Sequence, residues 1–332
     1  MQFDQLKRRQ FIALLGGAAV CPLAARAQQS MPPVVALING GAPNASAPYA
    51  AAFGKGLSEI GYDEQKNVMV EYHWLEGQYA LLPDLLDNLI RRRVAVIATP
   101  GSTPASLAAK AATATIPIVF GVGEDPVALG LIANLAKPGG NVTGINVFAF
   151  EVNAKRLSLM HELLPKATRF AVVVNPDNAP SAESTSSEIR KAAHGLGLDV
   201  LFFKASTSAE IDAAFTAMAG ERVDALFVAA DSFFTGRRVQ FATLAMRGRL
   251  PASFYGRESV QAGLLMSYGT NIADMFRQVG IYTGRILSGA KPADLPVLQS
   301  TKFEFVINLQ TARSLQIDVP PTLLARADEV IE

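Results

Sequence analysis

The chain holds three histidines and one cysteine, and the spacing of these residues supports neither a metal site nor a nucleophilic site. His161-Glu162 begins like the zinc-protease pattern H-E-x-x-H, but Pro165 stands where the second histidine is needed. The G-x-S-x-G turn that carries a catalytic serine is missing. We therefore expect no catalytic residue and no bound metal.

Nucleotide cofactors are equally unsupported. The turn after the first predicted strand, Asn39-Gly40-Gly41, lacks the spacing G-x-G-x-x-G, and Gly121-Val122-Gly123 runs into Pro126 where a helix-opening glycine is required. A Walker A loop is also missing. The sequence thus argues against a dehydrogenase or an ATPase and predicts no cofactor.

Polar residues cluster instead directly after the predicted strands. In open α/β sheets, ligands bind outside the carboxyl ends of the strands, so these loops predict a binding site. Its candidate residues carry hydroxyls, amides, backbone N–H groups and a few charges. They are Asn39, Thr99, Ser102, Thr103, Gly121, Val122, Asp125, Asn175, Asp231, Ser232, Tyr255, Arg257 and Glu258.

Two of these loops allow a purely structural alternative. Ser102 or Thr103 is placed to cap the helix that Pro104 begins, and the same helix end is where a ligand carboxylate can accept backbone N–H groups. Asp231 follows a buried strand and could likewise cap the next helix. Phe233, Phe234, Tyr255 and Tyr49 could stack on a ligand or pack in the core.

The elements that position these loops alternate along the chain. Apolar runs such as 34–38, 94–98, 116–120, 170–174 and 225–228 are followed by amphipathic stretches, with a short helix expected between 120 and 142. Continuous apolar runs, rather than alternation of apolar and polar residues, are typical of parallel strands that helices cover on both faces. We predict an α/β fold of two doubly wound lobes.

The lobes are assigned from where the two β-α series begin and end. Lobe I is expected to comprise 33–148 with about 264–295, and lobe II to comprise 149–263. The remainder, 296–332, is too short for a third domain and is expected to pack across both lobes.

Residues 1–27 are typical of an export signal. Arg8-Arg9 precede an apolar run that ends near Val20, and Ala25-Arg26-Ala27 offers small residues at a cleavage site. The arginine pair is typical of the twin-arginine type, although the general secretory route is also open. A membrane span needs roughly 20 apolar residues, so we expect cleavage near Ala27-Gln28, a periplasmic protein and no stable membrane insertion.

The composition agrees with an exported protein that binds small molecules. Cys21 lies inside the signal, so no disulfide is expected afterwards. The signal holds four basic residues and one acidic residue, which leaves a net charge of −2 for the rest of a chain whose total is +1. A weakly acidic chain without a basic block predicts no nucleic-acid partner.

Several strings together resemble one family of bacterial ABC-transporter substrate-binding proteins, the family with tryptophan- and tyrosine-binding members. The resemblance covers the whole chain after the signal. The strings are 115–120, 125–127, 135–144, 266–269, 289–296, 305–309 and 324–331.

This resemblance implies a type I periplasmic-binding-protein fold, with two lobes joined by three crossings and a ligand between them. It implies that 99–103 and 121–125 hold a ligand carboxylate, and that Asp231-Ser232 and the loop around Arg257 and Glu258 close on it. In amino-acid-binding members an acid in that loop meets the ammonium group, and Arg257 falls at its position. A cleft-facing Arg257 favours a carboxylic acid without an amino group, whereas a cleft-facing Glu258 allows an amino acid.

We therefore interpret the chain as the extracytoplasmic receptor of an ABC importer. It would capture a small organic carboxylate, either an amino acid or an aromatic or apolar acid, and present it to a membrane permease by hinge closure. Two alternatives stay open: an exported α/β enzyme, and a ligand sensor for a membrane receptor.

Overall fold

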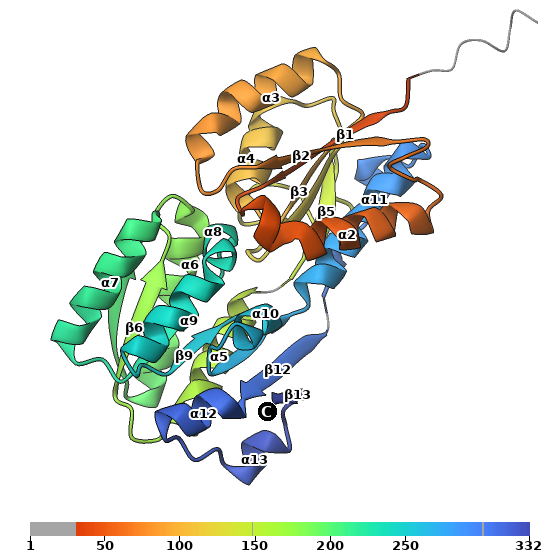
Figure 1. The fold of residues 1–332 in the computed structure, drawn as a ribbon. Helices are drawn as coiled ribbons and strands as arrows, with labels where there is room; N and C mark the ends of the chain where they lie inside the picture. Colours follow the sequence, from red (N-terminus) through yellow and green to blue (C-terminus); the bar gives the residue numbers. More distant parts are fainter. Residues whose placement is uncertain (1–30, 148, 301) are drawn as a thin grey trace, which may run out of the picture. The chain divides into compact units, whose positions relative to one another are not determined.

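Two separate sheets organise the computed structural model, which describes residues 31–147, 149–300 and 302–332 (Figure 1). The proposed export signal lies outside these residues. The first sheet has six strands in the order β11-β5-β4-β3-β1-β2, and the second has seven in the order β13-β12-β10-β9-β8-β6-β7. All pairings are parallel except that of β10 with β12.

The first sheet and its helices come mainly from the first half of the chain. Its elements are β1 (Val34–Asn39), α2 (Pro43–Glu59), β2 (Met69–Trp74), the 3₁₀ turn η2 (Tyr79–Leu81), α3 (Leu82–Arg91), β3 (Val96–Pro100), α4 (Thr103–Ala112), β4 (Ile118–Val122), β5 (Val142–Asn146), α11 (Ile272–Leu287), η3 (Pro292–Asp294) and β11 (Leu298–Gln299).

The second sheet and its helices occupy most of the rest. Its elements are α5 (Ala149–Leu163), β6 (Arg169–Val174), α6 (Ala179–Leu196), β7 (Asp199–Lys204), α7 (Ser208–Glu221), β8 (Ala225–Val228), α8 (Ser232–Gly236), α9 (Arg238–Arg247), β9 (Ala252–Phe254), α10 (Arg257–Gln261), β10 (Met266–Thr270), β12 (Phe303–Asn308), α12 (Leu309–Leu315), α13 (Pro321–Leu324) and β13 (Glu329–Ile331).

Helices bury both faces of each sheet. In the first, Leu86 of α3 packs on one face and Phe53 of α2 packs on the other, beside Val279 of α11. In the second, Ile189 of α6 and Ile211 of α7 lie in clusters on opposite faces. The central strands are therefore apolar on both sides, which explains their continuous Val, Ile and Phe runs. The predicted fold class is confirmed.

One predicted element is wrong. The segment between β4 and β5 contains turns where a short helix was expected, at least within residues 123–141 that the structure describes. Gly130, Gly139 and Gly140 adopt positive φ angles of 70°, 74° and 66°, outside the helical region. Asp125 also accepts hydrogen bonds from the backbone N–H groups of Val127 and Ala128, which favours a turn.

The segment 264–295, expected in lobe I, is divided between the sheets. Its strand β10 pairs in parallel with β9 of the second sheet, because the turn at Gly263 (φ 112°) returns the chain beside that strand. Its helix α11 packs on α2 of the first sheet. Of the tail 296–332, β11 pairs with β5 in the first sheet, whereas β12 and β13 lie in the second.

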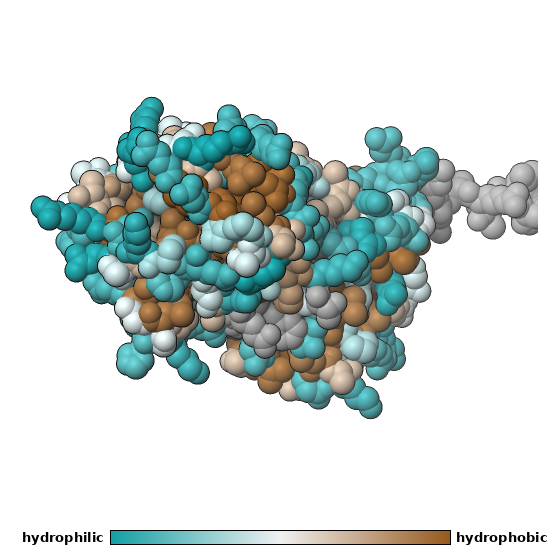
Figure 2. All heavy atoms as spheres, turned by 90° about the horizontal axis from the view of Figure 1, so that it is seen from below, coloured by the Kyte–Doolittle hydropathy of each residue, from teal (hydrophilic) through white to brown (hydrophobic). Residues whose placement is uncertain are grey.

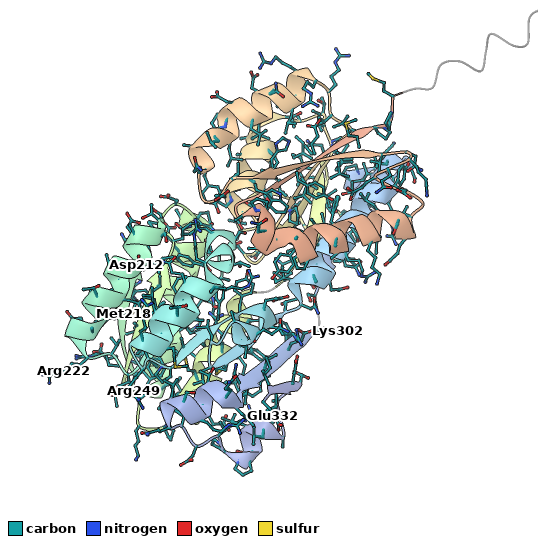
Figure 3. All side chains as sticks on the ribbon, in the orientation of Figure 1. Asp212, Met218, Arg222, Arg249, Lys302 and Glu332 are labelled. Carbon is teal, nitrogen blue, oxygen red and sulfur yellow. The ribbon has the colours of Figure 1, made fainter. Side chains whose placement is uncertain are left out.

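The chain passes between the sheets after β5, after β10 and after β11, and hydrogen bonds link these passages. Thr270 Oγ1 donates to the carbonyl of Val147 at 2.9 Å, and the Ser300 N–H donates to the carbonyl of Asn146 at 2.9 Å. Lys302, labelled in Figure 3, marks where the last passage enters β12, and Glu332 marks the end of the chain beside the second sheet. Hydrogen bonds therefore connect the first passage to each of the other two.

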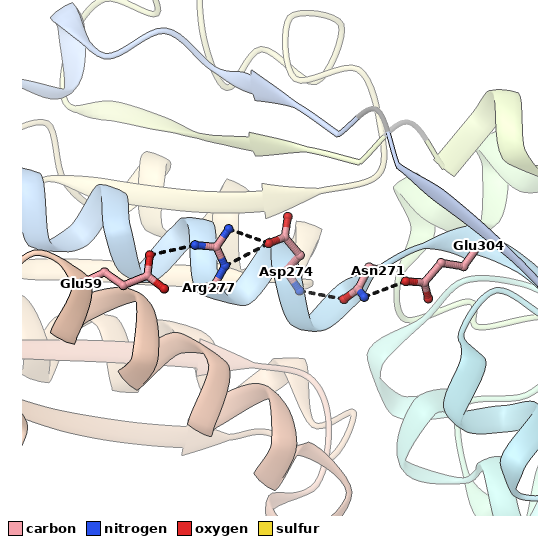
Figure 4. Close-up of polar contacts among 5 residues, drawn as sticks. All are labelled: Glu59, Asn271, Asp274, Arg277 and Glu304. Atoms are coloured by element: carbon pink, nitrogen blue, oxygen red, sulfur yellow. Dashed lines mark hydrogen bonds and ion pairs between the residues drawn. The ribbon is translucent and has the colours of Figure 1, made fainter. Parts of the chain in front are cut away.

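A row of polar side chains runs along α11 from the second passage (Figure 4). Asn271 caps the helix by accepting from the N–H of Asp274 at 2.8 Å, and its amide donates to Glu304 of β12 at 2.8 Å. Arg277 pairs with Asp274 at 2.8 Å and with Glu59 of α2 at 2.8 Å. These contacts fix the start of α11 against both β12 and α2.

The outer surface mixes hydrophilic and apolar residues, as the face in Figure 2 shows. None of the helices in the described part of the chain is long and apolar enough to cross a membrane.

Candidate functional site

One cavity lies where the carboxyl ends of the two sets of strands meet, and it encloses about 830 Å³ including its open mouth. Lobe I contributes Asn39, Tyr49, Gly101, Thr103, Gly121, Gly123, Glu124 and Val147, and α11 contributes Ile272, Met275 and Phe276. The second set of elements contributes Val152, Asn153, Asn178, Ser181, Ala230, Asp231, Ser232, Thr235, Tyr255, Gly269 and Thr270.

The amino end of α4 forms one wall of this cavity. Ser102 is the N-cap residue by its extended backbone, yet its side chain makes no capping hydrogen bond. The first N–H groups of a helix lack partners within the helix, so an uncapped end is a ready site for a carboxylate. Gly101, with φ 72°, lets the chain turn tightly into this helix beside Asn39. Asn39 braces the turn by donating to the carbonyl of Pro100 at 2.7 Å.

Glu124 is buried beside that helix end, with 7 % of its surface exposed. Its Oε2 atom accepts a hydrogen bond of 2.5 Å from the hydroxyl of Thr103, the first residue of α4. Burial raises the pKa of the Glu124 carboxyl, although hydrogen bonds from Thr103 and Ser181 oppose that rise. The chain thus holds an acidic group in a place that disfavours its own negative charge.

Asp231 is the second buried carboxyl of the cavity, and the protein uses both of its oxygens. Oδ1 accepts from the N–H of Phe234 at 3.2 Å, as the N-cap of α8, and from the amide of Asn175 at 3.1 Å. Oδ2 accepts from the amide of Asn178 at 2.9 Å. Burial raises the pKa of Asp231 as well, and these donors oppose it. Asp231 therefore fixes α8 to the loop after β6.

Helix α8 also contacts the turn between β3 and α4 of the first lobe. Ser232 Oγ donates a short hydrogen bond to the carbonyl of Gly101, and Thr235 Oγ1 lies 2.7 Å from the hydroxyl of Tyr255. Residues from both sheets therefore meet across the cavity.

Apolar side chains form the other wall. Tyr49 of α2 stacks on Phe276 of α11, with ring centroids 5.3 Å apart, and Met275, Ile272 and Val152 lie on the same cavity. Phe233 and Phe234 pack instead in the core of the second sheet, where Phe234 meets Phe241 edge-on at 5.3 Å. Of the four aromatic candidates, the structure brings Tyr49 and Tyr255 to the cavity.

Arg257 and Glu258 diverge at the start of α10. The Arg257 guanidinium pairs with Glu329 of β13, with Nη2 2.6 Å from Oε1. That contact lowers the pKa of Glu329. Glu258 points the other way: burial raises the pKa of the Tyr49 hydroxyl, and the nearby Tyr255 and Glu258 raise it further. Neither Arg257 nor Glu258 lines the cavity.

The structure brings six of the thirteen predicted site residues to the cavity wall: Asn39, Thr103, Gly121, Asp231, Ser232 and Tyr255. Several others lie behind it. Thr99 is buried in β3 with Oγ1 2.8 Å from Ser106 Oγ, Val122 packs in the apolar cluster with α3 and α4, and Asn175 supports Asp231. Asp125 is exposed in its turn.

Sequence reasoning did not single out Glu124, Asn153, Asn178, Ser181, Thr235 and Thr270, which also line the cavity. Glu124 stood inside a loop that was considered, one position before the chosen Asp125. Asn178 is the N-cap residue of α6 and Ser181 lies in its first turn, three and six positions after the chosen Asn175. Loop position was therefore a usable signal, whereas side-chain direction was not.

The described residues that line this cavity include no His, Cys, Lys or Arg. Groups of three or more His, Cys, Asp or Glu suited to a metal ion are likewise missing from the described parts of the chain. What the wall offers is hydrogen-bonding groups, two buried carboxyls and an apolar side, which is the chemistry of small-molecule binding.

Two parallel-stranded lobes with a cavity between their strand ends define the class of two-lobed α/β binding proteins. Within that class, residues 42–331 match the family described as ABC transporter substrate binding protein, and the chain belongs to this family. The predicted family is thereby confirmed. It is a family of binding proteins, which sets the enzyme alternative aside.

The chain is also similar to individual proteins in sequence and in structure. The chain is 27 % identical over 265 residues to a tyrosine-binding protein of Clostridioides difficile, covering 80 % of this chain and 75 % of the relative. A conserved domain protein from Vibrio cholerae is 28 % identical with a TM-score of 0.81, over 90 % of this chain and 99 % of the other. A Streptococcus protein solved in complex with L-Trp is 24 % identical with a TM-score of 0.81, over 90 % of this chain and all of the other.

Proposed function

We propose that this protein is the extracytoplasmic receptor of an ABC importer and that it captures an amino acid with an aromatic or apolar side chain. The observation that carries the proposal is the cavity walled by both lobes, with polar groups on one side and stacked aromatic rings on the other. The export pattern of residues 1–27 supports an extracytoplasmic location, where the protein would deliver its ligand to a membrane permease.

The head group of such a ligand would sit at the amino end of α4. A carboxylate there would accept N–H groups that Ser102 leaves uncapped, next to the hydroxyl of Thr103. The side chain would lie against Tyr49, Phe276 and Met275. The tyrosine-binding relative and the fold shared with the L-Trp complex support an aromatic amino acid in particular.

Capture would proceed by closure about the three passages between the lobes. A ligand that contacts Thr103 on one lobe and Ser232 on the other favours the closed form in proportion to its differential affinity. The hydrogen bonds of Val147 with Thr270 and of Ser300 with Asn146 lie beside these passages, so rotation there would leave each sheet intact.

A thermal-shift screen of L-amino acids, aromatic acids and neutral sugars tests the proposal on the purified chain without its signal. Ligand binding raises the melting temperature by a term that grows with RT ln(1 + [L]/Kd). We expect the largest shifts from aromatic amino acids. Shifts from neutral sugars alone, or chemical conversion of a bound compound, would overturn the proposal.

A further inference from the structure

Glu124 accepts fewer direct hydrogen bonds in the structure than Asp231, the other buried carboxyl of the cavity. A carboxylate has about four lone-pair positions. Asp231 uses its oxygens for the N-cap of α8 and for two asparagine amides. The Glu124 carboxylate accepts from the Thr103 hydroxyl on Oε2, and the hydroxyl of Ser181 and the N–H groups of Gly123 and Glu124 lie close to it.

The two buried carboxyls of the cavity, Glu124 and Asp231, also favour a ligand that carries a positive charge. Both buried carboxyls face a wall in which the described residues provide no basic side chain. An ionised group in a water-poor site is costly unless an opposite charge pairs with it. A ligand cation would supply what the chain itself does not place there.

The position of Glu124 fits one arrangement of ligand charges. Its Oε2 atom is 2.5 Å from the hydroxyl of Thr103, and Thr103 is also the first residue of the uncapped helix end. A possible anion site, the amino end of α4, and a possible cation site, the carboxyl of Glu124, are therefore neighbours, and Thr103 contacts both. In an α-amino acid, the carboxylate and the ammonium group are likewise attached to one carbon atom.

We propose that Glu124 is the residue that selects the α-ammonium group of the ligand. This inference rests on the proposed function and deepens it, because it assigns the cation site to the loop after β4 of lobe I. It places neither Arg257 nor Glu258 at the ligand's head group. Arg257 is already paired with Glu329, and the carboxyl of Glu258 lies by Tyr49 outside the cavity wall.

The test is a titration of Glu124→Gln with ligands that differ in one charge. The probes are L-tryptophan, tryptamine and indole-3-propionate, with L-tyrosine, tyramine and 3-(4-hydroxyphenyl)propionate as a second series. Glutamine keeps an oxygen that can accept from Thr103, and a melting curve of the variant checks its fold. Glu183→Gln, which removes an exposed carboxyl on α6, is the matched control.

Truncating one partner of a buried charge pair typically weakens binding by about 30-fold or more. We expect that loss in Glu124→Gln for the amino acids and the amines, about threefold or less for the two acids, and no change in Glu183→Gln. An equal loss for all probes, or an ammonium-specific loss in Glu258→Gln instead, would overturn the inference.

The two proposals fail in different ways. If the wild-type protein binds an aromatic amino acid and Glu124→Gln binds it equally well, the inference is wrong and the proposed function stands. If the wild-type protein binds none of the six probes and no amino acid stabilises it in the thermal-shift screen, both are wrong.

Discussion

Replacing Gly280 by alanine should loosen the helix pair that carries the aromatic wall of the cavity. Gly280 lies on α11 where this helix crosses α2, and a Cβ atom there would lie 2.2 Å from the carbonyl oxygen of Phe53. Ordinary contact begins at 3.4 Å, so the helices would have to separate by about 1.2 Å. Phe53 O belongs to the backbone, and a side-chain rotation cannot relieve the clash.

The expected size follows from two opposing terms. Overpacking a well-packed interface costs about 1–3 kcal/mol, and replacing a helical glycine by alanine returns roughly 0.5–1 kcal/mol. A net loss of about 1–2 kcal/mol corresponds to a melting temperature lower by roughly 1.5–3 °C in a protein of this size. Because Tyr49 and Phe276 stack across the same helix pair, ligand affinity should fall as well.

Gly220→Ala is the matched control. Gly220 lies in α7, and nothing stands within 4 Å of a Cβ placed there. This variant should keep or slightly raise the melting temperature and leave ligand affinity unchanged. Thermal denaturation followed by circular dichroism and calorimetric titration measure both effects. A Gly280→Ala protein as stable as the wild type would refute the packing argument.

Three further predictions concern the polar groups of the site. Glu124→Gln should stabilise the ligand-free protein at neutral pH, because burial raises the pKa of Glu124 in the folded state above its ordinary value of 4.5. The protonated carboxyl therefore stabilises the fold fully below pH 4.5, and this stabilisation is lost as the pH rises through the folded-state pKa. Denaturant melts from pH 4 to pH 8 should show that the stability gained by the variant grows with pH, and a constant gain would contradict this. Asp231→Ala should destabilise by about 2–4 kcal/mol, since it removes the α8 cap and leaves two amides unpaired; a loss below about 0.5 kcal/mol in a chemical denaturation curve would count against that role. Arg257→Ala should change ligand affinity by less than about threefold and stability by about 0–1 kcal/mol, because its partner Glu329 is partly exposed; a hundredfold loss of affinity in titration would return Arg257 to the binding site.

The fold was predictable because its signals are local. Runs such as Val34–Asn39 and Ala225–Val228 are apolar on both faces, and that pattern requires helices on both sides of a parallel sheet. The carboxyl ends of those predicted strands then identified the loops that meet at the cavity. The turn segment after β4 was harder to predict, because its glycines override the helical pattern.

The direction of each side chain within the loops depends on contacts between residues far apart in the sequence, which the local spacing of residues cannot predict. Arg257 points to Glu329, which lies 72 positions away along the chain, and this pairing turns it from the cavity. Asp125 turns outward to its own loop while its neighbour Glu124 turns inward to Thr103. Phe233 and Phe234 follow a strand end as Tyr255 does, yet the helices of the second sheet bury them.

Titration calorimetry of the wild-type chain and of Ala230→Trp with L-tryptophan and L-tyrosine tests whether the ligand binds in the cavity between the lobes. Ala230 lines the cavity between the lobes, and an indole at that position would occupy the space assigned to the ligand. We expect one binding site per wild-type chain, and no measurable binding by an Ala230→Trp variant that melts as a folded protein. Undiminished binding by folded Ala230→Trp would place the ligand outside this cavity.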